Sequence, residues 1–185
     1  MLAALLVLSF GTASSGREIR IGMSAAFAGP TRGLGIELYR GSMAYLSHIN
    51  ESGGIFGYNI KVIAYDDGYN PEPTIRNTIR LVEEDDVLLL FNYVGTPTVT
   101  RMLPLLKAYG GQRDIFLFFP FSGAQPQREG PYAQYAFNLR ASYSQEVAAL
   151  VDYLVSKGRS RIAVFYQIDA YGRSGLEGAH KALAK

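Results

Sequence analysis

The stretch VLLLFNYVGTPT, residues 87–98, decides the fold class. Residues 87–91 are a continuous apolar run, which is typical of a strand buried on both faces of a parallel sheet. The glycine and hydroxyl residues that follow are typical of a turn from a strand into a helix, and we expect that helix to run from Thr98 to Tyr109, where Gly110 and Gly111 close it. A buried strand followed at once by a helix is the repeating unit of a parallel α/β sheet.

The same alternation extends in both directions along the chain. Asn70 is expected to cap a helix that opens at Pro71, and Gly53 and Gly54 are expected to end the helix before it. The pattern predicts an α/β fold with a doubly wound parallel sheet and right-handed crossovers. Further strands are expected at 18–23, 60–65, 115–119 and 161–165, and further helices at 35–52, 70–84, 142–157 and from 174 to the end.

One long stretch, residues 119–142, interrupts the alternation. A loop of this length usually carries function or crosses between domains, and residues 135–140 could form a short crossing strand. We therefore predict an N-terminal ligand-binding lobe over residues 17–138. Residues 139–185 would be the incomplete start of a second lobe, because two helices and one strand cannot cover both faces of a parallel sheet.

The N-terminal residues have the pattern of an export signal. The apolar run from Leu2 to Phe10 is shorter than the ~20 residues that a membrane span needs, and small residues follow it. We expect residues 1–16 to be a signal peptide that is cleaved between Ala13 and Gly16. The alternative is a buried N-terminal strand or helix. The first interpretation makes the protein periplasmic or otherwise extracytoplasmic.

Composition excludes several classes of function. The 185 residues include 18 basic and 16 acidic side chains, and this net charge of +2 is too balanced for nucleic-acid binding. The absence of cysteine excludes disulfides, thiolate metal sites and cysteine nucleophiles. No phosphate-binding or dinucleotide-binding fingerprint occurs. His48 and His180 lie in expected helices without an evident partner, so we expect no enzyme, no metal and no cofactor.

The neighbouring carboxylates Asp66 and Asp67 have two interpretations. They could bind a metal or act as an acid–base pair. Because no third carboxylate or histidine has a supporting spacing, we favour their interpretation as turn residues at the end of a strand.

Two loops combine the features of a binding site for a small ligand. Ligands of open α/β sheets bind beyond the carboxyl ends of the strands. Gly95 would let the backbone approach a ligand, Thr96 and Thr98 offer hydroxyls, and the start of a helix presents unpaired N–H groups that suit a carboxylate. Ser122 adds a hydroxyl in the loop 121–125. The alternative, in which Thr98 only caps the helix and Gly95 only turns the chain, is equally consistent with these residues.

Five segments together resemble type I periplasmic binding proteins, in particular the branched-chain amino acid and amide-binding group that serves ABC importers. The resemblance extends from Glu18 to the end of the chain. The segments are IRIGMSAAFAGPTRGLG (19–35), INESGGIFGYNIKVIAYDDGYNP (49–71), YVGTPT (93–98), FPFSGA (119–124) and YQIDAYGRSGLEG (166–178).

The resemblance implies ligand contacts at matching positions. The loop 93–98 would hold the ligand's carboxylate, the loop 121–124 would contact its ammonium and carboxylate, and an aromatic residue of the second lobe would face the cleft. The residues implicated are Tyr93, Gly95, Thr96, Thr98, Phe121, Ser122, Gly123 and Tyr171. Leu34 stands where relatives often place a covering aromatic ring, and Ser122-Gly123-Ala124 also departs from the commoner pattern. A ligand other than leucine, isoleucine or valine is therefore compatible with the chain.

We expect an extracytoplasmic solute-binding protein that captures an amino acid or related small polar ligand between two lobes and passes it to the membrane permease of an ABC importer. The alternative is the ligand-sensing ectodomain of a sensor kinase or chemoreceptor. Relatives continue well past Lys185, so these residues alone are expected to bind weakly at best.

Overall fold

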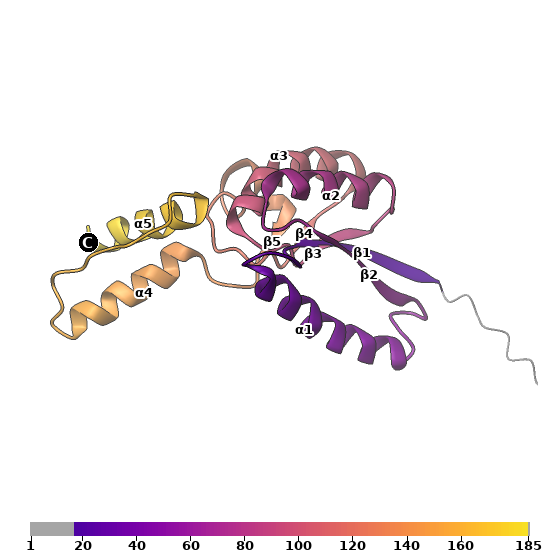
Figure 1. Ribbon diagram of the computed structural model, residues 1–185, viewed down its shortest axis with the longest axis horizontal. Coiled ribbons are helices and arrows are strands. Elements are labelled where there is room, and N and C mark those ends of the chain that lie inside the picture. The colour runs from indigo at the N-terminus through magenta and orange to yellow at the C-terminus, as the bar shows by residue number, and fades with distance from the viewer. Residues whose placement is uncertain (1–16, 185) are drawn as a thin grey trace, which may run out of the picture.

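Five parallel strands form one sheet in the order β2-β1-β3-β4-β5, as the computed structural model shows (Figure 1). The structure describes residues 17–184, and the expected signal peptide lies outside them. The strands are β1 (Glu18–Ala25), β2 (Asn59–Asp66), β3 (Leu89–Phe91), β4 (Leu117–Phe118) and β5 (Ala136–Phe137). The last strand is a two-residue version of the crossing strand expected at 135–140, and β3 and β4 are also shorter than predicted.

Helices cover both faces of this sheet. Helix α1 (Arg32–Glu51) lies on one face, and α2 (Pro71–Glu83) and α3 (Thr96–Arg113) lie on the other (Figure 1). The doubly wound α/β fold is thereby confirmed. The chain leaves β1 toward one face and β3 toward the other, so the topological switch point of the sheet lies between these neighbouring strands.

The main hydrophobic core lies between the sheet and the helices α2 and α3. Leu90 and Leu117 extend into it from the sheet, and Leu106 extends into it from α3, all fully buried. A smaller cluster of Met23, Ala25 and Val94 lies on the α1 side. The core therefore fixes the ends of β1 and β3, from which the loops at the switch point emerge.

Several local signals act as the sequence predicts. The side chain of Asn70 accepts a hydrogen bond from the backbone N–H of Glu72 at 3.2 Å and caps α2. Helix α1 ends at Glu51, and the positive φ angles of Gly53 and Gly54, 101° and 72°, turn the chain toward β2. Short-range capping and turn chemistry thus decides these helix ends.

The predicted limits of α3 are wrong at both ends. The helix begins at Thr96 rather than Thr98 and continues through Gly110 and Gly111 to Arg113. A Cβ atom on Gly110 would lie 2.2 Å from the ring of Tyr135, so this glycine accommodates close packing and does not end the helix. Asp114, in the left-handed conformation with φ 55°, ends it instead.

Two further helices, α4 (Tyr143–Ser156) and α5 (Ala170–Leu183), pack against each other beyond the carboxyl ends of the strands (Figure 1). Helix α5 begins four residues before the expected Ser174, because the side chain of Asp169 caps it by accepting from the N–H of Gly172 at 2.9 Å. Residues 161–165 do not form the predicted strand. A strand needs a neighbour for its backbone groups, and no strand within residues 17–184 pairs with this segment.

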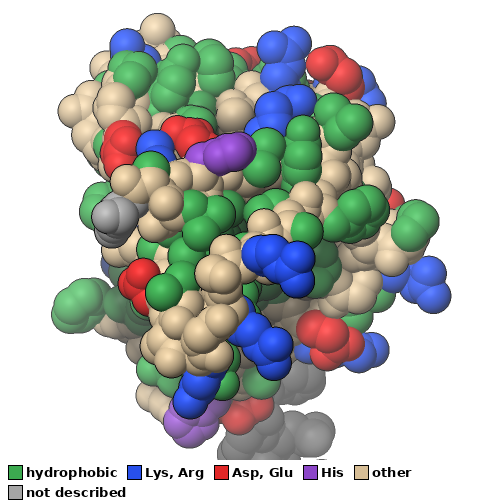
Figure 2. Space-filling model, turned by 90° about the vertical axis from the view of Figure 1, so that its left-hand side faces the viewer, with side chains coloured by type: hydrophobic (Ala, Val, Ile, Leu, Met, Phe, Trp, Pro, Cys, Tyr) green, Lys and Arg blue, Asp and Glu red, His purple; other side chains and the backbone are tan. Residues whose placement is uncertain are grey.

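Hydrophobic side chains lie among charged ones on the α4–α5 end of the molecule (Figure 2). The exposed apolar residues of this region include Leu150, Tyr153, Phe165 and Ile168. The helix pair therefore buries only part of its apolar surface against the rest of the described chain. None of the helices that the structure describes combines the length and the apolar character needed to cross a membrane.

Candidate functional site

Three hydroxyl groups from separate elements meet at the carboxyl edge of the sheet. The Thr96 hydroxyl lies 2.8 Å from the Ser122 hydroxyl and 3.0 Å from the Tyr143 hydroxyl. Thr96 opens α3, Ser122 lies in the loop after β4, and Tyr143 opens α4. All three residues are buried. The two loops that the sequence predicted to cooperate are therefore in direct contact, and a residue of α4 joins them.

Glycines make these contacts possible. Gly95 has φ 110°, and a Cβ atom there would lie 2.6 Å from the ring of Tyr69. A Cβ atom on Gly123 would lie 2.7 Å from the ring of Tyr143, whose backbone N–H donates to the Gly123 carbonyl at 2.7 Å. A side chain at either position would push a tyrosine ring away from the hydroxyl cluster, so both predicted site glycines have a steric role.

Aromatic and charged side chains surround Tyr143. The ring of Tyr171, from α5, packs edge-to-face against it with the centroids 5.1 Å apart. Tyr171 is 48% exposed and Tyr143 only 8%, so Tyr171 forms the solvent-facing side of the pair. The Arg140 guanidinium lies 5.2 Å from the centroid of the Tyr143 ring and 5.1 Å from that of Phe121, and it pairs with Glu146 at 2.5 Å. Tyr171 thus lies next to Tyr143, and Phe121 is connected to Tyr143 through the Arg140 guanidinium.

Tyr69 contributes a further phenol to this region. Burial raises the pKa of Tyr69, and the nearby Tyr143 and Asp169 raise it further. A backbone hydrogen bond from Thr96 opposes this rise. Tyr69 has the unusual φ of 64°, and its own backbone N–H donates to Asp67 at 2.8 Å. The loop after β2 therefore places an aromatic ring beside the start of α3.

The two neighbouring carboxylates have structural partners, as the sequence favoured. Asp66 accepts backbone hydrogen bonds from Phe27, Ala28 and Gly68, at 2.7, 3.2 and 3.0 Å. Burial alone would raise the pKa of Asp66, but these hydrogen bonds outweigh it and lower the pKa. Burial raises the pKa of Asp67, which is not paired with a cation within the described residues. Both aspartates thus hold together the loops that follow β1 and β2.

Two predicted site residues do not reach the cluster. The side chain of Tyr93 is fully buried in the main core, and its hydroxyl lies 3.0 Å from that of Thr78. Burial raises the pKa of Tyr93 far above the usual range. The Thr98 hydroxyl donates to the carbonyls of Val94 and Gly95, at 2.7 and 2.8 Å. Within the described residues the Tyr93 side chain thus has a core position and the Thr98 hydroxyl has local backbone partners, and a ligand contact from either residue stays a prediction.

Sequence reasoning missed Tyr69 and Tyr143. Tyr69 lies within DDGYNP, one of the segments that carried the family resemblance, but only the chain path shows that its ring reaches Gly95. Tyr143 directly follows the capping residue Ser142. The sequence signal for Tyr143 was its position: it is a hydroxyl-bearing aromatic residue in the first turn of a helix that directly follows the crossing segment.

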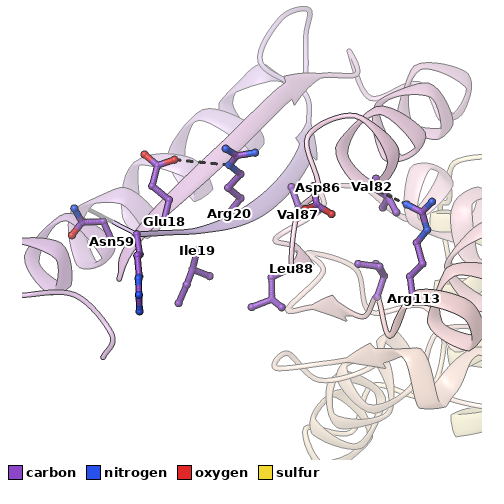
Figure 3. Close-up of a pocket in the computed structure, with 11 residues that line it drawn as sticks. Glu18, Ile19, Arg20, Asn59, Val82, Asp86, Val87, Leu88 and Arg113 are labelled. Atoms are coloured by element: carbon purple, nitrogen blue, oxygen red, sulfur yellow. Dashed lines mark hydrogen bonds and ion pairs between the residues drawn. The ribbon is translucent and has the colours of Figure 1, made fainter. Parts of the chain in front are cut away.

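One hollow of the described structure lies at the opposite edge of the sheet. It has a volume of about 1150 Å³ and lies among the amino ends of the strands, where Figure 3 shows Arg20 beside Glu18 and Arg113 beside Val82. Arg20 contacts Glu18 and the carbonyl of Asp85, and Arg113 donates to the carbonyl of Val82. Because these cations have partners and no predicted site residue lies there, this hollow does not define the candidate site.

A second hollow, of about 390 Å³, adjoins the hydroxyl cluster. It lies between α4, α5 and the segment 162–167, and Tyr143 and Tyr171 are among its lining residues. Within residues 17–184, no group of three or more histidine, aspartate or glutamate side chains is arranged to hold a metal ion. The hydroxyl cluster and the Tyr143–Tyr171 pair offer hydrogen bonding and aromatic packing.

Comparisons with known proteins identify relatives over almost the whole chain. The Periplasmic binding protein family profile matches residues 18–185. An amino acid binding protein of Pseudomonas aeruginosa is 26% identical over 89% of this chain and 43% of its own length. The Leu/Ile/Val-binding protein of Escherichia coli is 25% identical over 100% of this chain and 49% of its own length. The chain thus spans about half the length of the curated relatives it matches.

A solved structure gives the same result for the fold. The crystal structure of a possible leucine/isoleucine/valine-binding protein from Rhodopirellula baltica superposes with a TM-score of 0.84 at 35% sequence identity. The match covers 94% of this chain and 46% of that one. The relatives' names describe binding proteins rather than enzymes.

Proposed function

Because this chain belongs to the periplasmic binding protein family, we propose that it captures an amino acid or a related small polar ligand for import into the cell. The protein would work outside the cytoplasm and pass its ligand to the membrane permease of an ABC importer. The names of the relatives from Pseudomonas aeruginosa and Escherichia coli support an amino acid as the ligand class. No cofactor and no nucleic acid takes part in this proposal.

The observation that carries the proposal is the 2.8 Å contact between the hydroxyls of Thr96 and Ser122. These residues come from two loops that emerge next to each other at the carboxyl edge of the sheet, where open α/β sheets bind ligands. A carboxylate at this position would accept the hydroxyl hydrogen that the Thr96–Ser122 hydrogen bond leaves over. The start of α3 at Thr96 favours a negative charge at the same place.

The second side of the site would come from the segment that follows the crossing. We assign residues 17–138 to the first lobe and residues 139–185 to the start of the second, so that Tyr171 covers the ligand from α5. Closure of two lobes around a ligand excludes water, which strengthens the polar contacts inside. Leu34 is 44% exposed in the first turn of α1 and offers no aromatic cover from the first lobe.

Thermal unfolding of the full-length protein with a panel of amino acids, amides and small carboxylates tests this function. A ligand that binds only the native state at a hundredfold excess over its Kd stabilises it by ~2.7 kcal/mol. Thr96→Val keeps the shape of the side chain and removes the hydroxyl, so we expect it to abolish the shift.

The matched control is Thr100→Val, one turn further along the same helix. The Thr100 hydroxyl has no hydrogen-bond partner within the described residues, so its removal should leave both folding and binding intact. An absence of stabilisation by every ligand class, or an equal loss of binding in both variants, would contradict the proposed function.

A further inference from the structure

The hydroxyl cluster holds more hydrogen-bond donors than it uses. Thr96, Ser122 and Tyr143 carry three hydroxyl hydrogens, and only two hydrogen bonds connect them. The one other hydrogen bond to these hydroxyls runs inward, from the backbone N–H of Ala124 to Ser122 at 3.3 Å. In the part of the chain that the structure describes, no acceptor therefore takes the third hydrogen.

A buried donor without an acceptor is unfavourable. The exposed fractions of Thr96, Ser122 and Tyr143 are 1%, 0% and 8%, so bulk water has little access to the spare hydrogen. Because Thr96 lies between the other two hydroxyls, rotation of the three O–H bonds can bring the spare hydrogen to Tyr143 or to Ser122 at either end of the chain of contacts. The cluster is thus prepared for an acceptor group from outside the described chain.

We propose that Tyr143 is a further ligand-contacting residue, whose phenol donates a hydrogen bond to the ligand's carboxylate beside Thr96 and Ser122. A phenol O–H is a stronger hydrogen-bond donor than the two aliphatic hydroxyls, because the ring withdraws electron density from its oxygen. Tyr143 also lines the hollow of about 390 Å³, so a ligand can approach it from the side of Tyr171. This inference rests on the proposed function, because it names a contact within the same site.

The position of Tyr143 gives this contact a second consequence. Tyr143 is the first residue of α4, whereas Thr96 opens α3 and Ser122 lies in the loop after β4. A carboxylate that accepts the spare hydrogen from Tyr143, beside Thr96 and Ser122, would connect the two parts of the chain directly. The binding position would then select ligands that carry a hydrogen-bond acceptor at this end and disfavour the same ligands without one.

Titration calorimetry on the full-length protein tests the proposal with the twenty common L-amino acids as probes. Tyr143→Phe keeps the ring and its packing against Tyr171 and removes only the hydroxyl. For an amino acid that binds the unaltered protein, we expect the Kd in this variant to rise roughly ten- to a hundredfold, as for the loss of other hydrogen bonds to a charged group. The amino alcohol that corresponds to this amino acid lacks the carboxylate, so Tyr143→Phe should raise its Kd much less. The matched control is Tyr153→Phe, an exposed residue of the same helix, which should leave both Kd values unchanged.

The possible outcomes distinguish a failure of this inference from a failure of the proposed function. If the unaltered protein binds no amino acid, the proposed function fails and the inference fails with it. If the unaltered protein binds and Tyr143→Phe binds equally well, only the inference is overturned. Should Tyr143→Phe not fold, 3-fluorotyrosine at position 143 keeps both ring and hydroxyl. Its fluorine resonance should then shift when the ligand saturates the site, and an unchanged resonance would overturn the proposal.

Discussion

The Ser24 hydroxyl donates a hydrogen bond to the Asp67 carboxylate at 2.8 Å, and both residues are almost completely buried. Ser24 belongs to β1 and Asp67 follows β2, so the bond ties two neighbouring strand ends together. Asp67 also accepts from the Thr74 hydroxyl at 3.1 Å and from the backbone of Tyr69 at 2.8 Å. The carboxylate therefore controls the loop that places Tyr69 beside the start of α3.

The acceptor function of Asp67 predicts a difference between two substitutions. Asp67→Ala leaves the donors of Ser24 and Tyr69 without an acceptor, whereas the Thr74 hydroxyl keeps the carbonyl of Asn70 at 2.9 Å. We therefore expect the free energy of unfolding to fall by roughly 1–3 kcal/mol. Asp67→Asn keeps one acceptor oxygen and removes a buried charge, so it should stay closer to the unaltered protein. Urea unfolding at neutral pH measures both values. Equal losses in the two variants would show that the charge, and not hydrogen bonding, holds this loop.

The two neighbouring aspartates should give stability profiles of opposite sign against pH. Burial raises the folded-state pKa of Asp67 above its ordinary 3.8, so its contribution to stability is fully present below that pH and is lost as the pH rises through the folded pKa. The folded-state pKa of Asp66 is lowered, because its three backbone hydrogen bonds outweigh the effect of burial. Its contribution is present above pH 3.8 and is lost as the pH falls through the folded pKa.

Urea unfolding between pH 3 and 7 checks this prediction with Asp66→Asn and Asp67→Asn. The stability of the unaltered protein relative to Asp67→Asn should decrease as the pH rises, whereas its stability relative to Asp66→Asn should increase. Two difference curves with the same slope would contradict the assignment of the two environments.

Sequence predicted those features that depend on neighbouring residues. The cap at Asn70 and the glycine turn at Gly53 involve groups only a few residues apart, and both occur where they were expected. The helix was expected to stop at Gly110, but the ring of Tyr135 packs there and makes the glycine a packing residue. The strand expected at 161–165 depends on a pairing partner, which is a property of the fold and not of the segment.

In the candidate site, too, the sequence did not predict contacts between residues that lie far apart along the chain. Thr96 and Ser122 could be proposed separately, because each follows a predicted strand. The contact with Tyr143 spans 47 residues from Thr96 and depends on the path of the crossing segment. Tyr93 has the residue type of a cleft aromatic, but its side chain points into the core. Composition and spacing cannot distinguish these two orientations at the end of a strand.

Gly95→Ala should damage the site more than the fold. An alanine at φ 110° is strained by roughly 1–2 kcal/mol, and its methyl group would displace the ring of Tyr69. We expect reduced stability and a loss of ligand-induced stabilisation in thermal unfolding.

Gly111→Ala is the control, because a Cβ atom there meets nothing within 4 Å. In a helix interior that change should stabilise by roughly 0.5–1 kcal/mol and leave binding intact. Loss of binding in both variants would contradict the steric role assigned to Gly95.

The capping residue of α4 links helix stability to the hydroxyl cluster. Ser142 accepts from the backbone N–H of Gln145 at 3.2 Å, and the Gln145 side chain accepts from the backbone N–H of Ser142 at 2.9 Å. This capping box fixes the first turn of α4, which carries Tyr143. Ser142→Ala removes one of the two bonds and should lower the free energy of unfolding by roughly 0.5–2 kcal/mol.

Because the first turn of α4 would then fray, Ser142→Ala should also loosen the hydrogen bond between Tyr143 and Thr96 and weaken ligand binding. Hydrogen exchange of the Tyr143 amide, which donates to the Gly123 carbonyl at 2.7 Å, reports this loosening directly and should accelerate. Ser156→Ala is the matched control at the other end of the helix, where the hydroxyl donates only to the carbonyl of Tyr153 in an exposed setting. If Ser142→Ala lowers the global stability without faster exchange at Tyr143, the capping box supports the helix but does not position the tyrosine.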